Sequence, residues 1–406
     1  MRLNKVQDWM IDNNSGKKRV ALYVDSLKIG GAERITLTFA RWCAESGWTP
    51  IVLTRKGLDA DFYPIPHGVR RAVEPQEPSW LMRFGRWGFP WRVVRLRRWL
   101  RAEAIDMAVG MTTKPSVKLL LAARPLDVPC VVSERNYPPL KRMTLPWGIL
   151  RRFTYAWASL HLVQTRATGQ WLDQRLAARP QLLMPNPVQW PLQRFTPEVD
   201  PNAWLADQGV PRNAPVLLGA GTKSHQKGFD VIVRALIPLA RRVPQLQLVI
   251  LGLDAEPYHG VNQQQALRHL LRQAPDVAER LHFPGRVGNM ADWYARCSFF
   301  VLPSRYEGFP NVLLEAMASG CVCLASDCPH GPADLIEHGR NGLLLPRRAR
   351  PDQWSDVLAD LLMDPERCRG LADRALDVRS RYSEPELRSR FVHALEQLLQ
   401  GTRSAP

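Results

Sequence analysis

The sequence predicts an α/β fold with two doubly wound, Rossmann-like domains facing each other across a cleft. Apolar runs typical of buried parallel strands alternate with longer helical patterns, and this alternation restarts near residue 216 after a proline-rich stretch. A chain of 406 residues is also too long for one ordinary core and suits two domains.

The predicted strands form two series. Those of the first half cover residues 20–24, 51–54, 107–109, 130–133 and 160–164. Those of the second half cover residues 216–219, 248–251, 282–283, 299–302, 322–325 and 342–345. Each motif described below follows one of these strands, at the edge where ligands of open α/β sheets bind.

The domain boundaries follow from the same alternation. We expect a first domain over residues 17–187, a proline-rich linker over 188–201 and a second domain over 202–380. A helix over residues 381–400 comes after the second sheet, and we expect it to pack back on the junction.

The composition is typical of a soluble globular protein, with 45% apolar and 23% charged residues. No run of about 18 apolar residues occurs, and the N-terminus lacks the apolar core of a signal peptide. We therefore expect a cytoplasmic protein. The seven cysteines include no CxxC pair, which favours reduced packing thiols over a zinc site or disulfides.

The net charge of +17 indicates an anionic partner, which is nucleic acid, anionic lipid or a phosphorylated small molecule. Residues 83–101 concentrate arginine among tryptophan and phenylalanine, and residues 141–153 form a second basic and aromatic cluster. This composition suits the surface of an anionic bilayer. The alternative is an ordinary amphipathic helix whose apolar stripe faces its own domain. That stripe would contain Val93, Leu96, Leu100 and Ala104.

Residues 303–320 are the most informative segment, because they place two glutamates on a loop that opens into a helix. Glu307 lies in the predicted loop and Glu315 in the helix, with Pro310 at the first helical position. The backbone N–H groups of Phe309, Asn311 and Val312 would then be unpaired and face a ligand. Backbone donors suit phosphate oxygens and carboxylates suit sugar hydroxyls, so a nucleotide sugar fits. The alternatives are a glycosidase pair of acids and a salt-bridged helix surface.

Two glycine-bounded loops supply further candidates. Gly30 and Gly31 precede a helix that begins near residue 32, where a phosphate or acceptor group could bind, although a plain tight turn is the alternative. Lys223 and Lys227 lie between glycines in a loop that does not match a P-loop. Either ammonium could neutralise a diphosphate leaving group, and solvated lysines are the alternative. His225 is expected to be a turn residue.

With these residues assembled, the chain resembles the retaining nucleotide-sugar glycosyltransferases of family 4, which have the two-domain GT-B fold. The motifs that carry the resemblance are EGFPNVLLEA from Glu307, QKGFD around Lys227, GGAER from Gly30, PGRV from Pro284 and HGRNGLLLP from His338.

The resemblance implies an acceptor-binding first domain and a second domain that binds the nucleotide sugar. It implies that Glu315 binds the ribose, Glu307 the donor sugar hydroxyls, and Lys227 the diphosphate. The backbone of Gly308, Phe309, Asn311 and Val312 would line the sugar and phosphate, and Arg286 and Val287 would flank the base. Such enzymes need no metal or other cofactor.

Two departures from the family pattern stand out. Many relatives carry an Arg where this chain has Thr222, and Lys223 is the candidate to replace its charge. Many also carry a His after the third or fourth strand of the first domain, where this chain reads GMTTKPS from Gly110. The segments SERNYPP from Ser133 and SDCPHGP from Ser326 resemble the subset that uses UDP-GalNAc, UDP-GlcNAc or UDP-galactose.

The sequence therefore predicts a retaining transferase that moves a hexose or N-acetylhexosamine from a UDP-sugar to a glycan, with polyprenyl diphosphate as the expected carrier. The expected setting is bacterial polysaccharide or oligosaccharide assembly, on the inner face of the cytoplasmic membrane and without nucleic acid. A nucleotide-sugar epimerase and a basic nucleic-acid binder are the alternatives.

Overall fold

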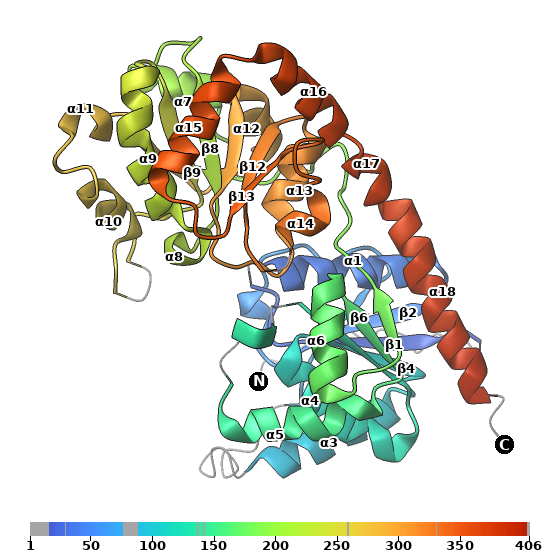
Figure 1. Ribbon diagram of the computed structural model, residues 1–406. Coiled ribbons are helices and arrows are strands. Elements are labelled where there is room, and N and C mark those ends of the chain that lie inside the picture. The colour runs from blue at the N-terminus through green and yellow to red at the C-terminus, as the bar shows by residue number, and fades with distance from the viewer. Residues whose placement is uncertain are drawn as a thin grey trace. The chain divides into compact units, whose positions relative to one another are not determined.

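The computed structural model describes residues 16–403 apart from 29, 76–87, 136–137, 141–142, 258–259 and 330. These residues form two parallel sheets, each covered by helices, as predicted (Figure 1). Packing divides the chain into two compact units. One consists of residues up to Ser133, residues 146–160 and the chain from Val392 onward; the other consists of residues 134–145 and 161–391.

The first sheet has the strand order β3-β2-β1-β4-β5-β6-β7 within the described residues. Its strands are β1 (Arg19–Val24), β2 (Thr49–Thr54), β3 (Arg70–Val73), β4 (Met107–Met111), β5 (Cys130–Glu134), β6 (Leu160–Val163) and β7 (Gln181–Leu183). Its helices are α1 (Gly31–Glu45), α3 (Phe89–Ala102), α4 (Thr113–Ala123), α5 (Leu145–Thr154) and α6 (Arg166–Leu176). Short 3₁₀ turns are η1 (Leu58–Ala60), η3 (Arg124–Leu126), η4 (Pro138–Leu140) and η5 (Tyr155–Trp157).

The second sheet has the order β10-β9-β8-β11-β12-β13 within the described residues. Its strands are β8 (Val216–Ala220), β9 (Gln247–Leu251), β10 (Leu281–Gly285), β11 (Phe299–Leu302), β12 (Val322–Asp327) and β13 (Leu343–Pro346). Its longer helices are α7 (Pro201–Asp207), α9 (Phe229–Arg242), α10 (Gln263–His269), α12 (Met290–Arg296), α13 (Asn311–Ala318), α15 (Pro351–Leu362), α16 (Pro365–Ala375) and α18 (Glu384–Arg403). Four-residue helices are α8 (Ser224–Lys227), α11 (Pro275–Ala278), α14 (Pro332–Leu335) and α17 (Val378–Arg381).

Two apolar cores, one on each face, explain why the strands of the second sheet read as continuous apolar runs. Leu217 faces the core that contains α9 and α15, whereas the next residue, Leu218, faces the core that contains α12 and α13. Val301 and Phe300 on β11 divide in the same way. Successive side chains of a strand point to opposite faces, so a strand covered on both sides must be apolar throughout.

Two edge strands, β3 and β7, were not predicted from the sequence. Both are only partly buried, and the sequences RRAV and QLL lack the apolar run or the alternation that identifies a strand. Strand β3 pairs with β2, and strand β7 pairs with β6. This pairing stabilises the two edge strands, whereas their own residues have little preference for strand structure.

The structure favours the alternative interpretation of the arginine-rich helix. Val93, Leu96 and Leu100 of α3 are buried, and α3 packs against α4 in its own unit. The prediction for Ala104 was wrong, because α3 ends at Ala102 and Ala104 is exposed. Residues 83–87 lie outside the described residues. The apolar stripe of α3 is therefore part of a protein core.

The proline-rich linker is hydrogen-bonded to the second sheet's loops. The Phe195 N–H donates to the Gly288 carbonyl over 3.0 Å, and the Gly288 N–H donates to the Pro197 carbonyl over 2.6 Å. Asn289 exchanges side-chain hydrogen bonds with both backbone groups of Val199. A Cβ atom at Gly288 would lie 1.7 Å from the Phe195 carbonyl oxygen, so this approach requires glycine.

The seven cysteines are free thiols, as predicted. The Sγ atoms of Cys297 and Cys321 are 3.7 Å apart, and both thiols donate to the Tyr294 carbonyl. The sulfurs therefore contribute packing and weak hydrogen bonds next to β12.

Stability should fall in acid because of one buried histidine. His282 on β10 hydrogen-bonds through Nε2 to Gln247 Oε1 at 2.8 Å, and burial, helped by Arg268, lowers the pKa of His282 to about 4. Between pH 6.5 and 4 the unfolded chain binds a proton that the folded chain excludes, so the free energy of unfolding decreases as pH falls. The decrease attributable to His282 should reach about 3 kcal/mol by pH 4. Urea unfolding of wild type and His282→Gln across this range measures it, and equal pH dependence in both proteins would contradict the assignment.

Candidate functional site

The candidate site lies where the strand order of the second sheet reverses, between β8 and β11. The chain leaves these neighbouring strands in opposite directions, so the loops after their carboxyl ends leave an opening between them. The loop after β8 carries the two predicted lysines, and the loop after β11 carries Glu307. The reversal in strand order therefore brings the two strongest sequence motifs together.

A buried ion pair joins these loops. Lys227 Nζ lies 2.8 Å from Glu307 Oε1, which also accepts a hydrogen bond from Ser304 Oγ at 2.5 Å. Glu307 is only 4% exposed, and Lys227 is largely buried. An ammonium has three donors, so Lys227 retains the capacity to hold a ligand oxygen while bound to Glu307.

Two glycines make the approach of Lys227 possible. A Cβ atom on Gly221 would lie 2.8 Å from Lys227 Cε, so this glycine makes room for the lysine stem. Gly228 has φ +65°, and a Cβ there would lie 2.0 Å from the Pro303 carbonyl oxygen. Only glycine lets the loop after β8 approach the loop after β11 this closely.

A second ion pair, which sequence reasoning missed, links the same loops. Arg305 holds the Asp230 carboxylate through two hydrogen bonds of 2.7 and 2.6 Å and also donates to the His225 carbonyl. Burial alone would raise the pKa of Asp230, but the Arg305 guanidinium outweighs it and the pKa is lowered. The prediction that His225 is a turn residue was wrong, because it lies in the short helix α8; its carbonyl and not its ring serves this junction. No sequence pattern links residues 75 positions apart, so only the fold identifies the pair.

The start of α13 differs from the prediction in two respects. Pro310 precedes the helix as its cap and is not its first residue, because its ψ of 84° is not helical. The Asn311 N–H is not unpaired: it donates to the Phe309 carbonyl over 3.1 Å and closes a tight turn around Pro310. The anion site predicted here therefore cannot use the Asn311 backbone donor.

Glu315 and Glu307 have different partners. Tyr294 donates to the Val312 carbonyl at 3.1 Å and approaches Glu315 Oε2 at 3.5 Å. Burial first, and the neighbouring Glu315 carboxylate second, raise the pKa of Tyr294 well above its usual value, so it remains a donor. Lys227 thus contacts Glu307, and Tyr294 contacts Glu315.

The remaining residues predicted to bind the donor have other neighbours in the structure. Lys223 is exposed, and its carbonyl accepts from the Lys227 N–H. Arg286 forms an ion pair with Asp254 at 2.5 Å, and Val287 beside it is half-buried. Gly308 is half-buried and Phe309 is buried against Tyr382.

The loop after β12 packs directly on Glu307. Gly331 has φ +110°, and a Cβ there would lie 2.6 Å from Pro310 Cδ and 3.5 Å from Glu307 Cβ. Burial raises the pKa of the nearby Cys328 thiol to about 12, with a contribution from the Glu307 charge, so this cysteine stays protonated. His330 of the same motif lies outside the described residues.

The predicted Gly30 and Gly31 turn lies in the other compact unit, after β1 at the reversal between β1 and β4. Helix α1 begins at Gly31, and a Cβ on Gly30 would lie 2.2 Å from Glu33 Oε2. Burial raises the pKa of Glu33. A carboxylate therefore already lies beside the helix start where a phosphate or acceptor group was predicted.

The loop after β4 carries strain that the sequence did not indicate. Thr112 has φ +83°, although it is β-branched, which costs about 1–3 kcal/mol. Its carbonyl accepts hydrogen bonds from both the N–H and the hydroxyl of Ser116. Thr112 lies in the GMTTKPS motif, the place where the sequence lacks the histidine of many family 4 relatives.

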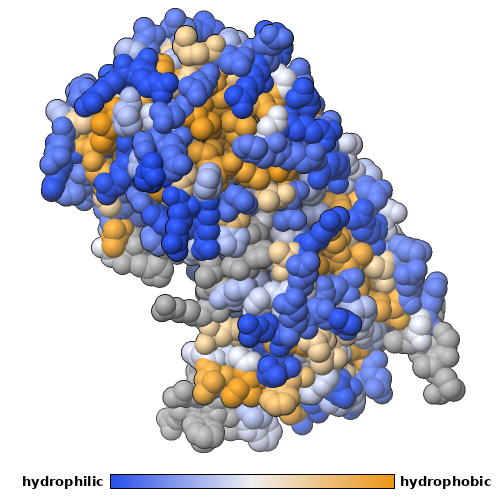
Figure 2. Space-filling model, viewed as in Figure 1, coloured by the Kyte–Doolittle hydropathy of each residue, from blue (hydrophilic) through white to orange (hydrophobic). Residues whose placement is uncertain are grey.

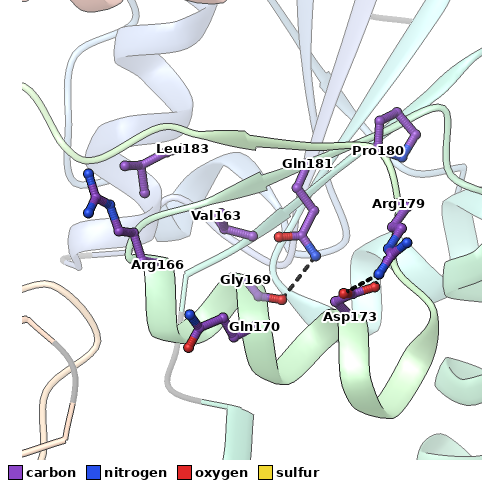
Figure 3. A pocket seen from close by; sticks show the side chains of 9 residues that line it. All are labelled: Val163, Arg166, Gly169, Gln170, Asp173, Arg179, Pro180, Gln181 and Leu183. Atoms are coloured by element: carbon purple, nitrogen blue, oxygen red, sulfur yellow. Dashed lines mark hydrogen bonds and ion pairs between the residues drawn. The ribbon is translucent and has the colours of Figure 1, made fainter.

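A pocket of about 920 Å³ lies between α6 and the edge strand β7 (Figure 3). Among its lining residues, Arg179 and Asp173 form an ion pair, and Gln181 donates to the Gly169 carbonyl. None of the predicted site residues lines this pocket. The lining residues are Val163, Arg166, Gly169, Gln170, Asp173, Arg179, Pro180, Gln181 and Leu183.

The described residues include no group of three or more His, Cys, Asp or Glu side chains placed to hold a metal ion.

The HGRNG motif has a structural role: Asn341 accepts from the Glu337 N–H and donates to the Leu335 carbonyl, and the His338 ring accepts from the Leu344 N–H.

Comparison with known proteins gives two family matches that follow each other along the chain. Residues 29–189 match the model described as Glycosyltransferase Family 4, and residues 214–364 match Glycosyl transferases group 1. A D-inositol 3-phosphate glycosyltransferase of Thermobispora bispora is 30% identical over 47% of this chain and 45% of its own length. The matched part spans about a third to a half of the length of the first curated relatives.

Solved structures resemble nearly the whole chain. HepE of Anabaena, determined in complex with UDP, has a TM-score of 0.77 at 19% identity, covering 94% of this chain and 100% of that one. WaaG, described as a glycosyltransferase involved in lipopolysaccharide biosynthesis, has a TM-score of 0.68 at 16% identity, covering 91% and 98%. At these identities the likeness shows the fold.

The close approach of the two loops predicts unequal effects of two glycine substitutions. Gly228→Ala and Gly209→Ala both place a side chain at positive φ, but a Cβ at Gly209 meets nothing within 4 Å. Gly209→Ala should cost about 1 kcal/mol of unfolding free energy, and Gly228→Ala at least about 3 kcal/mol because it also strikes Pro303. Urea unfolding measures both, and equal losses would contradict the proposed fit between the loops.

Proposed function

We propose that the chain is a glycosyltransferase of the group 1 and family 4 type, and that it transfers a hexose or N-acetylhexosamine from a UDP-sugar to a polyprenyl-diphosphate-linked glycan. We further propose that the transfer retains the anomeric configuration. The observation that carries this proposal is the buried Lys227–Glu307 pair at the strand reversal of the second sheet. The UDP complex of the structural neighbour HepE supports UDP as the nucleotide.

The two ends of the site match the two ends of a nucleotide sugar. Lys227 donates to a diphosphate oxygen, and Glu307, fixed by Ser304 and Lys227, accepts from hydroxyls of the donor sugar. Glu315, beside Tyr294, accepts from the ribose hydroxyls. Arg286 and Val287 flank the base.

The reaction replaces one bond at the anomeric carbon. The acceptor hydroxyl attacks from the face that UDP leaves: its oxygen bonds to the anomeric carbon as the bond to the β-phosphate oxygen breaks. The proton of that hydroxyl passes to the departing phosphate. Lys227, with Lys223 as the second cation, stabilises the negative charge that develops on UDP, which is why no metal is required in this proposal.

A lipid-linked acceptor requires contact with a membrane, and α5 offers a suitable surface. Leu145, Ile149 and Phe153 follow one another at helical spacing and are 78%, 47% and 64% exposed. Figure 2 shows apolar side chains gathered over α5. The second basic and aromatic cluster expected from the sequence, residues 141–153, includes this stripe, while Lys141 and Arg142 lie outside the described residues.

Basic groups and aromatic rings lie around this stripe. Lys114 lies over the Trp147 ring at 5.6 Å, and Arg124 lies over the exposed Trp157 ring at 4.4 Å. Exposed apolar side chains bordered by cations and tryptophans suit the headgroup region of an anionic bilayer. In the part of the chain that the structure describes, no helix combines the length and apolarity needed to span a membrane.

The donor site predicts loss of transfer without loss of fold. Lys227→Met and Glu307→Gln should each lower UDP release from UDP-sugar and a lipid-linked acceptor by at least about 100-fold. Each also leaves one buried charge unpaired and should lower stability by about 3 kcal/mol, whereas the double variant should regain stability without activity. The exposed Lys17→Met is the control. Full activity in either single variant would contradict the site.

Analysis of the sugar products separates a transferase from the alternative, a nucleotide-sugar epimerase. Incubation with donor alone should leave the sugar unchanged, whereas an epimerase would convert it.

The α5 surface predicts a specific membrane contact. Ile149→Ser with Phe153→Ser should reduce sedimentation with vesicles containing phosphatidylglycerol by about tenfold or more, since each side chain loses about 1 kcal/mol or more of apolar burial. The matched control is Met363→Ser, an exposed apolar residue of the other unit. Equal binding by the double variant and wild type would contradict this contact.

A further inference from the structure

A chain of buried polar side chains ends on the first residue of α13. Arg135, Gln164 and Asn186 follow the carboxyl ends of β5, β6 and β7, which are neighbouring strands, and they are 9%, 6% and 4% exposed. Arg135 Nη1 and Gln164 Nε2 both donate to Asn186 Oδ1, over 2.7 and 2.9 Å. Asn186 Nδ2 donates to Asn311 Oδ1 over 2.6 Å. All four residues belong to the same compact unit.

The guanidinium of Arg135, the first group in this series of hydrogen bonds, fixes the orientation of the Asn186 and Asn311 side-chain amides. Arginine carries only donors, so Asn186 must turn its oxygen toward Arg135 and its nitrogen toward Asn311. Asn311 must then turn its oxygen toward Asn186. Burial lowers the pKa of Arg135 to about 9, which still leaves it protonated at pH 7. The amide nitrogen of Asn311 is thereby kept as a donor on the side away from Asn186.

This donor belongs to the segment that carries Glu307, whose partner Lys227 binds the diphosphate in the proposed function. Asn311 is half-buried and begins α13, four residues after Glu307, which holds Lys227. Its backbone N–H is consumed by the turn around Pro310, so the side chain is the polar donor that this residue has to offer a ligand. A cation in the same hydrogen-bond chain polarises the amide and strengthens its donation to an anion.

Resting on the proposed function, we propose that Asn311 Nδ2 binds a diphosphate oxygen of the nucleotide donor, and that Arg135 and Asn186 are positioning residues that orient it. Arg135 acts only through Asn186. The sequence gives no sign of this role, because Asn311 was expected to contribute its backbone, and Arg135 belonged to a segment read only for its resemblance.

The test is a double-mutant cycle read by calorimetric binding of UDP. Asn311→Ala should weaken UDP binding by about tenfold, the loss of one hydrogen bond to a charged group. Asn186→Asp keeps the acceptors for Arg135 and Gln164 but has no N–H for Asn311, so it should weaken binding by several-fold. In the Asn311→Ala background, Asn186→Asp should have no further effect, because the group that it orients is gone.

The cycle separates orientation from the added charge. An effect of the new carboxylate on UDP through space would persist without the Asn311 amide, so additive losses would overturn the proposal. The matched control is Asn262→Asp at the start of α10, which also loses one amide donation, to the Ala255 carbonyl, while either side chain accepts from the Gln265 N–H; UDP binding should not change. Thermal unfolding of each variant checks that the fold is kept.

Arg135→Met gives a second route if Asn186→Asp does not fold. It removes the group that fixes the amides, so UDP binding should weaken by less than in Asn311→Ala, with no further effect in the Asn311→Ala background. Undiminished UDP binding by Asn311→Ala overturns this inference alone. A wild-type protein that binds neither UDP nor UDP-glucose overturns the proposed function and this inference together.

Discussion

The buried pair of Lys227 and Glu307 is the constraint on which the second sheet's site depends. Two charges withdrawn from water are tolerated only when their geometry is close and their remaining hydrogen-bonding groups are satisfied. Here Ser304 donates to the same Glu307 oxygen as Lys227, and the glycines at 221 and 228 let the two loops approach. The Arg305–Asp230 pair then holds the same loops from the solvent side. The strand reversal thus holds an ammonium group and a carboxylate side by side.

The parallel topology explains why so much chemistry gathers at strand ends. Parallel strands all end at the same edge of their sheet, so residues that are distant in sequence become neighbours there. The first sheet delivers Arg135, Gln164 and Asn186 from three successive strands. The second sheet delivers Lys227 and Glu307 from the two strands at its reversal.

The sequence predicts the central strands and the loops of the site because both are governed by local rules. A strand buried on both faces must be apolar throughout, and a glycine-bounded loop before a helix has a recognisable pattern. The edge strands β3 and β7 escape these rules because pairing, not composition, defines them. The pairs Arg305–Asp230 and Asn186–Asn311 escape them because they join residues far apart in the chain. The backbone at Asn311 was predicted wrongly because ψ at Pro310 is 84° and not helical, and proline restricts φ but not ψ.

The central claim is that the two loops around the Lys227–Glu307 pair hold the diphosphate and sugar of a UDP-sugar. A crystal structure of the wild-type chain with UDP tests it most directly. The account predicts diphosphate density within about 3 Å of Lys227 Nζ and of the Asn311 side-chain amide, a normal hydrogen-bond distance. UDP bound elsewhere, with the Lys227–Glu307 pair untouched, would contradict it.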